Sequence, residues 1–211
     1  MTGSPQGQIT TKGESVKKNI IILILALFGS ATFAAPTVIH LEKAKSEVGF
    51  LAVGTPSAIK IRGRADDVGQ IVTGTFKWEK NSITGSAIMR LDTFSTGIEM
   101  RDKHMKEKYL ETQKFPQSEL TLTKLELPDS ATGEKFELEK IPFEGQLTLH
   151  GIKKPVMGLV DIKKKGEKAE LDFDFKFPLS NFGIEVPTFM GIKVTDDVQV
   201  TVAVETQLSS T

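Results

Sequence analysis

The sequence predicts an all-β protein, an eight-stranded antiparallel barrel with one helix at an end. Through most of residues 37–207 apolar side chains alternate with polar ones, which is the period of a strand with one buried face. Only residues 97–110 show helical spacing instead. Strands with one apolar face pack as two stacked sheets or as a closed barrel, and closure removes the edge strands that promote aggregation. A barrel of about eight strands is either filled by side chains or holds one ligand.

Strands are expected before the helix at residues 48–50, 59–61, 72–78 and 83–91. In each of them every second residue is apolar or small, so one face points toward the core. Residues 81–82, Asn and Ser, favour a turn between the last two of these strands.

The helix is expected over residues 97–110. Thr96 and Glu99 have the spacing of a capping box, in which a hydroxyl and a carboxylate satisfy main-chain N–H groups left free at a helix start. Pro116 disfavours helical backbone at the residue before it. The helix should therefore begin near Gly97 and end before Pro116.

The helix carries one apolar face, because Ile98, Met105 and Tyr109 recur at helical spacing. Arg101 and Asp102 are adjacent in sequence and lie on different sides of a helix, so we do not expect them to pair with each other. We expect each to bond a strand end or a loop and to fix the helix across the mouth of the barrel. The predicted anchor or lid residues are Arg101, Asp102, His104, Met105 and Tyr109.

Strands are also expected after the helix. A slip in the alternation within residues 120–127 predicts a bulge or a bend. Residues 156–162 are apolar on both faces, which predicts that both faces are covered. The strands are expected at residues 120–127, 143–149, 156–162, 171–177 and 198–204, and the loops at residues 128–133, 151–155 and 163–168.

Small residues interrupt several apolar strand faces, and they leave two interpretations open. A glycine on such a face contributes no packing volume, so it either marks a corner where the sheet bends or leaves a lumen open. The residues are Gly74, Gly85, Ala87, Gly145 and Gly158.

The composition excludes several classes of function. The chain has 211 residues, no cysteine, 27 basic and 27 acidic side chains. Without cysteine there is no disulfide, no thiolate chemistry and no cysteine-ligated zinc. The balanced charge gives no electrostatic footprint for nucleic acid, so we expect no nucleic-acid partner.

The N-terminal residues predict export from the cytoplasm. Residues 16–28 combine a short basic start with an apolar run, and residues 29–35 are mostly small, as in a secretory signal peptide. The run is shorter than the ~20 residues of a membrane span. We expect cleavage after Ala34 and a periplasmic or secreted domain at residues 35–211. Residues 1–15 do not resemble the start of a signal peptide and are expected to be non-native or a misassigned start.

Histidine and methionine offer the candidate metal ligands. His40, His104 and His150 lie on separate predicted elements, so no histidine metal site is expected. Met100, His104 and Met105 lie within about one helical turn and could ligate copper, against the alternative that Met105 belongs to the core. No catalytic constellation stands out, and we predict that the protein is not an enzyme.

Several segments make the chain similar to the YceI-like family. They are SEVGF at residues 46–50, STGIEMRDKHM at 95–105, FP at 115–116, and FEGQLTLHG at 143–151 with Pro155. The resemblance spans residues 36–207. It implies a lipocalin-like, eight-stranded barrel, secreted or periplasmic, that binds polyisoprenoid chains such as quinone tails.

Two segments depart from the family pattern. Many members carry a histidine where this chain has residues 51–54, LAVG, and an RSDFG stretch where it has residues 179–183, LSNFG. The resemblance implies that polar contacts near the ligand or the barrel seam are lost here.

We therefore expect a binding protein that holds an isoprenoid lipid or isoprenoid quinone in the lumen, for transport or storage, with no other cofactor. The alternatives are a metal-binding or enzymatic protein that uses His104, Met100 and Met105, and a structural or stress module without a ligand. The candidate partners are the lipid, a membrane that the protein contacts transiently, and a second copy of the chain in a homodimer. The predicted wall residues are Phe50, Phe76, Met89, Leu91, Leu147, Phe173, Phe175, Val200 and Val202.

Overall fold

A computed structural model describes Gly3 and residues 37–55, 59–65 and 71–210 of the chain. The barrel lies within a compact unit that spans Ala34–Thr211. The expectations for residues 1–15 and 16–34, and for cleavage after Ala34, fall outside the described residues. Among those residues no helix has the length and apolarity needed to cross a membrane.

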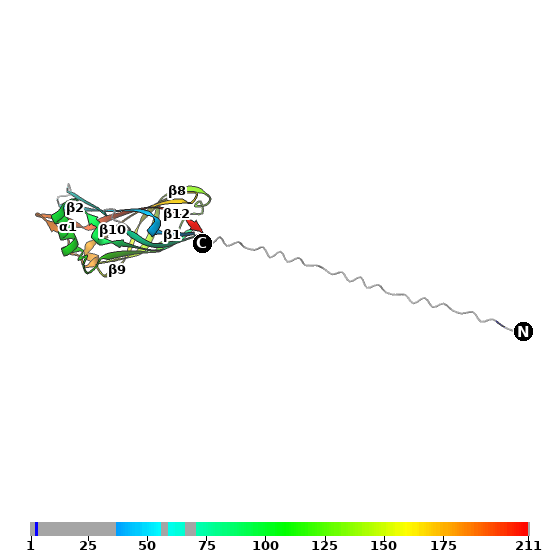
Figure 1. Ribbon diagram of the computed structural model, residues 1–211, viewed down its shortest axis with the longest axis horizontal. Helices are drawn as coiled ribbons and strands as arrows, with labels where there is room; N and C mark the ends of the chain where they lie inside the picture. The colour runs from blue at the N-terminus through cyan, green and yellow to red at the C-terminus, as the bar shows by residue number, and fades with distance from the viewer. Residues whose placement is uncertain (1–2, 4–36, 56–58, 66–70, 211) are drawn as a thin grey trace. The chain divides into compact units, whose positions relative to one another are not determined.

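The described residues form one antiparallel sheet of thirteen strand segments (Figure 1). The strands are β1 (Thr37–His40), β2 (Lys45–Thr55), β3 (Lys60–Ala65), β4 (Val72–Glu79), β5 (Ser82–Arg90), β6 (Phe94–Ser95), β7 (Gln117–Leu125), β8 (Lys135–Leu149), β9 (Ile152–Lys165), β10 (Lys168–Pro178), β11 (Thr188–Phe189), β12 (Ile192–Gln207) and β13 (Ser209–Ser210). The helical elements are α1 (Glu99–His104), the π-helical turn η3 (Met105–Tyr109), and the 3₁₀ turns η1 (Leu41–Lys43), η2 (Leu91–Thr93) and η4 (Leu179–Phe182).

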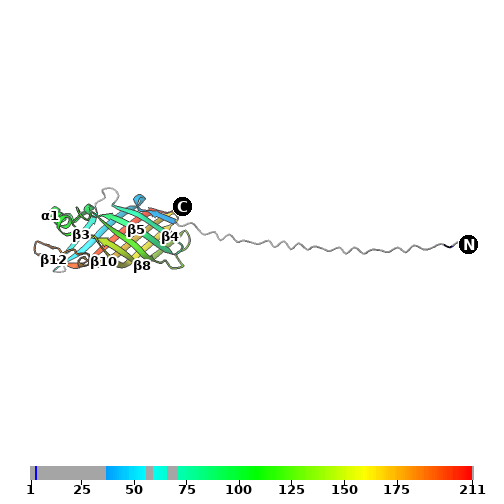
Figure 2. The ribbon, with the colours of Figure 1, turned by 90° about the horizontal axis from the view of Figure 1, so that it is seen from below.

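The pairing register joins these segments into a closed ring. β1 pairs with β4 and β2 pairs with β3, so β1 with β2 runs antiparallel to β3 with β4. β5 pairs with β4 and its continuation β6 pairs with β3. β12 pairs with β2 and its continuation β13 pairs with β1, which closes the ring. The predicted all-β barrel is therefore confirmed. Its eight strands comprise twelve of the segments because several strands are interrupted, and the remaining segment, β11, pairs only with β12. Figure 2 shows the strands running obliquely along the barrel.

The helical segment lies where the sequence predicts it, but its start differs. α1 begins at Glu99 and continues without a break into η3, which ends at Tyr109. The predicted capping box is wrong, because Ile98 is the N-cap residue and no side chain caps the helix. Ile98 is also exposed, so it does not belong to the packed face.

Two predictions about β8 and β9 are corrected by the register. Residues 156–162 are not covered on both faces, because Val156 and Val160 are buried whereas Met157 and Leu159 point to the outside of the barrel. The loop expected at residues 151–155 is shorter, since Leu149 pairs with Ile152 and the turn consists of two residues. Both turn residues have positive φ, 52° at His150 and 74° at Gly151, which suits the right-handed twist of a hairpin. The predicted slip in β7 is confirmed as a register shift between Leu122 and Lys124.

The glycines within the strands mark close approaches of the barrel wall. A Cβ at Gly74 would lie 2.2 Å from the carbonyl oxygen of Ser86, and one at Gly85 would lie 2.2 Å from that of Thr75. Both glycines have φ near 140°, a conformation that side chains disfavour. At these two positions the neighbouring strand therefore lies too close for a side chain.

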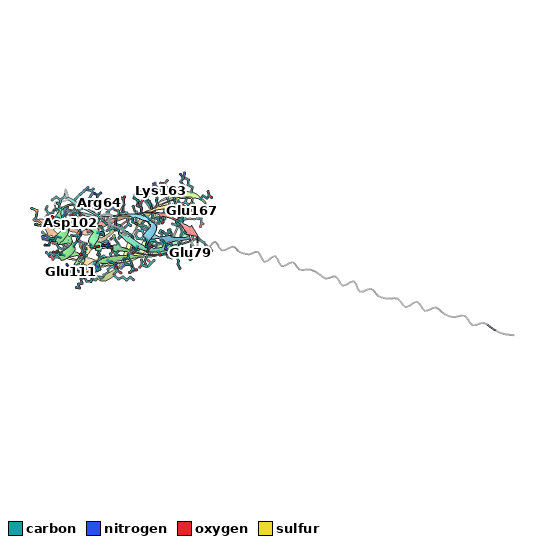
Figure 3. The ribbon with its side chains drawn as sticks, in the orientation of Figure 1. Arg64, Glu79, Asp102, Glu111, Lys163 and Glu167 are labelled. Atoms are coloured by element: carbon teal, nitrogen blue, oxygen red, sulfur yellow. The ribbon has the colours of Figure 1, made fainter. Side chains whose placement is uncertain are left out.

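Aromatic side chains fill the interior along β10. Phe143 packs edge-to-face against Phe173, with ring centroids 5.4 Å apart, and Phe175 lies 6.0 Å from Phe143 and 6.1 Å from Phe177. Beyond this group, toward the end of the barrel where β9 ends at Lys165, the interior is packed. There the Trp78 and Phe136 rings lie edge to face, with centroids 5.8 Å apart. Figure 3 shows Lys163, Glu79 and Glu167 at that end and Asp102 at the helical end.

Candidate functional site

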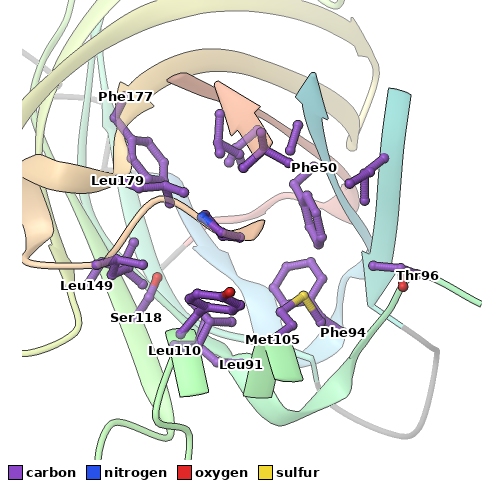
Figure 4. A pocket seen from close by; sticks show the side chains of 18 of the residues that line it. Phe50, Leu91, Phe94, Thr96, Met105, Leu110, Ser118, Leu149, Phe177 and Leu179 are labelled. Atoms are coloured by element: carbon purple, nitrogen blue, oxygen red, sulfur yellow. The ribbon is translucent and has the colours of Figure 1, made fainter. Parts of the chain in front are cut away.

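A cavity of about 160 Å³ lies inside the barrel at the end covered by the helical segment (Figure 4). Carbon atoms form nearly all of its surface. The walls come from β2, β3, β5, β6, β7, β8, β10 and β12, the roof from the helical segment, and the rim from residues 179–187. The lining residues are Phe50, Ala52, Ile61, Met89, Leu91, Phe94, Thr96, Arg101, His104, Met105, Tyr109, Leu110, Ser118, Leu147, Leu149, Phe175, Phe177, Leu179, Ile184, Pro187, Val194, Val198 and Val200.

Phe50 is held at the cavity wall by a glycine on the neighbouring strand. A Cβ at Gly63 would lie 2.2 Å from the Phe50 ring, so the ring lies directly over the backbone of β3. The other side of Phe50 packs edge-to-face on Phe94, with ring centroids 5.4 Å apart. The glycine thus provides the space that turns a large aromatic side chain toward the cavity.

The predicted wall residues divide by their depth in the barrel. Phe76 and Phe173 are buried in the packed part of the core, and Val202 is partly buried against it, so these three do not line the cavity. Six predicted wall residues do line it: Phe50, Met89, Leu91, Leu147, Phe175 and Val200. The two-residue period groups the apolar residues that share one face of a strand. How far along the barrel axis each of them lies has no signal in the local sequence.

The predicted lid residues form the roof of the cavity, with one exception. Arg101, His104, Met105 and Tyr109 all line it, and Asp102 does not. The adjacent residues Arg101 and Asp102 do not bond each other. As predicted, each instead bonds the segment that precedes the helix.

Thr96 connects the two charged residues. Its hydroxyl donates to Asp102 Oδ1 and accepts a hydrogen bond from Arg101 Nε at 2.8 Å. Its main-chain N–H donates to Asp102 Oδ1 at 2.8 Å, and its carbonyl accepts from Arg101 Nη2 at 3.0 Å. The Ser95 hydroxyl donates to Asp102 Oδ2 at 2.7 Å. The first helical turn is thereby tied to the end of β6.

These contacts change the pKa of Asp102. Burial raises the pKa of this carboxyl, but hydrogen bonds from Thr96 and Ser95, together with the nearby charge of Lys106, outweigh burial. The pKa of Asp102 is therefore held below its ordinary value of 3.8. The carboxylate remains ionised at neutral pH.

The far end of the helical segment is fixed by residues that the sequence did not point to. His150 Nε2 lies 2.6 Å from Glu111 Oε2, and His150 Nδ1 lies 3.1 Å from the carbonyl oxygen of Phe182. The His150 ring also packs on Phe115, with centroids 4.5 Å apart. Because these residues are 32 to 39 positions apart, no local pattern could have predicted the contact.

The segment that departs from the family pattern lies at the cavity rim. Leu179 lines the cavity at the position where many members carry arginine, and Phe182 is fully buried behind it. Ser180 faces the other way, and its N–H donates to Asp196 Oδ1 at 2.8 Å. Of the other segment that departs from the pattern, residues 51–54, Ala52 lies in the wall. At both places the chain presents an apolar side chain to the cavity.

The candidate copper ligands are divided between the cavity and solvent. Met105 and His104 line the cavity, whereas Met100 is 64% exposed. In the part of the chain that the structure describes, no group of three or more His, Asp or Glu side chains could hold a metal ion.

Comparison with known proteins identifies the family of the domain. The family model of the YceI-like domain matches residues 40–206. Protein YceI of Salmonella arizonae is 32% identical over 121 residues, which cover 53% of this chain and 59% of that protein. The chain thus spans about three fifths of the length of the curated relatives it matches.

Two solved structures share the fold. A polyisoprenoid binding domain from Saccharophagus degradans, implicated in plant cell wall breakdown, has a TM-score of 0.60 at 11% identity, covering 83% of this chain and 99% of that one. BcnA of Burkholderia cenocepacia has a TM-score of 0.58 at 18% identity, covering 76% of this chain and 95% of that one. With the family match over most of the barrel, these findings show that the chain belongs to the YceI-like domain family.

Proposed function

We propose that this protein binds a long apolar lipid of the isoprenoid type, an isoprenoid quinone or a polyprenyl chain, and carries or stores it without altering it chemically. The observation that carries the proposal is the almost wholly apolar cavity under a helical lid inside a closed barrel. The fold shared with a polyisoprenoid binding domain supports it. The predicted signal peptide supports a periplasmic or secreted location.

The size of the cavity limits how such a lipid is held. An apolar cavity of about 150 Å³ takes one benzene-sized molecule, so 160 Å³ does not hold a long chain. The lid must therefore move, or side chains must rearrange, when a lipid binds. Met89 and Met105 line the cavity and are suited to this, because methionine side chains are flexible and fill irregular spaces.

Affinity should depend on chain length in a characteristic way. Each buried CH₂ contributes ~0.8 kcal/mol, so a chain of ~40 carbons would nominally gain ~30 kcal/mol, beyond the ~20 kcal/mol reached by non-covalent complexes. The ordering of a flexible chain offsets part of this gain. We expect affinity to rise steeply with the first carbons and to level off once the chain reaches the mouth.

The lid has few strong attachments, which favours its opening. Its polar contacts include those of Arg101 and Asp102 with residues 95–96, of Tyr109 with Thr188, of Glu111 with His150, and an exposed ion pair between Lys108 and Glu185 at 3.8 Å. Elements with few contacts open at free energies below that of global unfolding. A lipid that enters a closed barrel needs such an opening, so we assign the helical segment the role of a gate.

Exposed apolar side chains surround the same end of the barrel and support transient contact with a membrane. Met100 at the start of the lid is 64% exposed, and Met190 at the tip of the β11–β12 hairpin is 86% exposed. This hairpin is bonded to the lid through Thr188 and Tyr109. Large exposed apolar groups beside a cavity mouth are typical of contact with a partner or a membrane.

The proposal is tested by extracting the protein from its native compartment and analysing bound lipid by mass spectrometry, followed by uptake of an added isoprenoid quinone. Ala52→Phe should block uptake, because Ala52 lines the cavity and a phenyl ring takes up its volume. Ala203→Phe on the outer face of the same wall is the matched control. If the wild type carries no stoichiometric lipid and takes up no added quinone, the proposal is disproved.

A further inference from the structure

Ser118 places a hydroxyl group inside the apolar cavity. It is the second residue of β7, it lines the cavity, and it is 7% exposed. Its neighbours on the inward face of β7 are Leu120 and Leu122, and directly across the ladder it pairs with Met89 of β5. Figure 4 shows the Ser118 oxygen turned toward the interior of the cavity, beside Leu149.

The other polar side chains of the cavity are engaged with protein groups. The Thr96 hydroxyl bonds Arg101 and Asp102, and the Tyr109 hydroxyl bonds the main chain of Thr188. His104 has an interaction of its own. Within the described part of the chain, Ser118 is the polar lining residue whose side chain makes no hydrogen bond.

A hydroxyl that opens onto an apolar cavity without a protein partner is unfavourable, and packing does not explain it. Buried polar groups are almost always hydrogen-bonded, because removing them from water without a partner is costly. Alanine would occupy the same space in the wall without that cost. A serine at this place therefore fits a partner that enters the cavity.

We propose that Ser118 forms a hydrogen bond with an oxygen of the bound lipid, so that the polar head of the lipid lies inside the cavity and its tail runs out under the lid. This inference rests on the proposed lipid-binding function. A serine hydroxyl both donates and accepts, so it suits a carbonyl or a hydroxyl head. The volume agrees, because 160 Å³ takes one six-membered ring, the size of a simple quinone head.

The experiment compares two probes that share a decyl tail and a six-membered ring, of which one ring carries oxygens and the other does not. One is 2-decyl-1,4-benzoquinone and the other is decylbenzene, which has the same tail and a ring without oxygens. Dissociation constants are measured for the wild-type protein, for Ser118→Ala, for Ser118→Thr, which retains a hydroxyl, and for Ser86→Ala, a serine of β5 that does not line the cavity.

Ser118→Ala should weaken the quinone about tenfold and leave decylbenzene within about twofold, because only the quinone loses a hydrogen bond; tenfold corresponds to about 1.4 kcal/mol. Ser118→Thr should restore most of the quinone affinity, and Ser86→Ala should change neither probe. Equal changes for both probes, or no change for either, would overturn the inference while leaving lipid binding intact.

Two further outcomes count against the inference. If the wild type binds neither probe, the proposed function fails and this inference falls with it. If Ser118→Ala without ligand melts several degrees below the wild type, the hydroxyl has a protein partner in solution. The inference instead predicts an unchanged or higher melting temperature for that variant.

Discussion

The Tyr109 hydroxyl and the main chain of Thr188 are joined by two hydrogen bonds across 79 residues of sequence. The hydroxyl accepts from the Thr188 N–H at 3.1 Å and lies 3.2 Å from the Thr188 carbonyl oxygen. Tyr109 is buried at the end of the lid, and Thr188 begins the β11–β12 hairpin. This pair fastens the end of the lid to the β11–β12 hairpin.

Removing the hydroxyl should loosen the lid without disturbing its packing. Tyr109→Phe keeps the ring and leaves two main-chain groups of Thr188, an exposed residue, to water, so we expect a loss of ~1 kcal/mol in unfolding free energy. Lipid transfer between vesicles should become faster. Urea unfolding and a transfer assay measure both, and a slower transfer would argue against gating by this contact.

Arg101→Ala tests whether the first turn of the lid gates the cavity or only stabilises the barrel. The change removes two hydrogen bonds to Thr96 from a partly exposed guanidinium, so we expect ~1 kcal/mol of destabilisation and a severalfold faster transfer. Lys103→Ala, an exposed change on the same turn, is the control. A variant that melts lower yet transfers at the wild-type rate would show that the segment holds the barrel together and that the entrance lies elsewhere.

Acid should weaken the attachment of the lid through Asp102. Because its pKa is lowered in the folded protein, Asp102 contributes stability that is complete above its ordinary pKa of 3.8 and is lost as the pH falls through the lower, folded-state value. Asp102→Asn should therefore be less stable than the wild type at pH 7, and the difference should shrink below pH 3.8. Urea unfolding at a series of pH values measures it, with Asp129→Asn in an exposed loop as control. A difference that persists unchanged in acid would show that ionisation of Asp102 does not matter.

Most of the fold could be predicted from the alternation of apolar and polar residues, and the predictions that failed did so for a physical reason. The alternation in 171–177 appears in the structure as the buried and exposed residues of β10, because the period of a strand is a local property. The same rule failed at Met157 and Leu159, which are apolar yet face outward, since the period cannot distinguish a covered face from an exposed apolar one.

In the helix and the site too, the contacts that could not be predicted are those that depend on how distant segments are brought together. Thr96 has the spacing of a capping residue, but its hydroxyl bonds Arg101 and Asp102, and this choice depends on how the segment leaves β6. The contact of Glu111 with His150 needs the β8–β9 turn to be brought beside the lid. No pattern within either segment could reveal it.

The exposed methionines at the mouth should matter for collection of lipid from membranes. Met100→Gln with Met190→Gln should slow transfer from vesicles severalfold at unchanged stability, because both side chains are exposed and contribute little to the fold. Met157→Gln is the matched control, since Met157 is 73% exposed on β9, away from the cavity lining. Equal slowing by the control and the double variant would contradict a specific role for the mouth.

The central claim is that the lipid lies in the cavity under the lid, and the methionine methyl groups test it most directly. Met89 and Met105 line the cavity, whereas Met157 lies on the outside of the barrel. In a protein with ¹³C-labelled methionine methyl groups, an added isoprenoid quinone should shift the Met89 and Met105 signals and give nuclear Overhauser contacts to both, with Met157 unchanged. Contacts to Met157 without any to Met89 and Met105 would place the lipid on the outer surface and contradict the account.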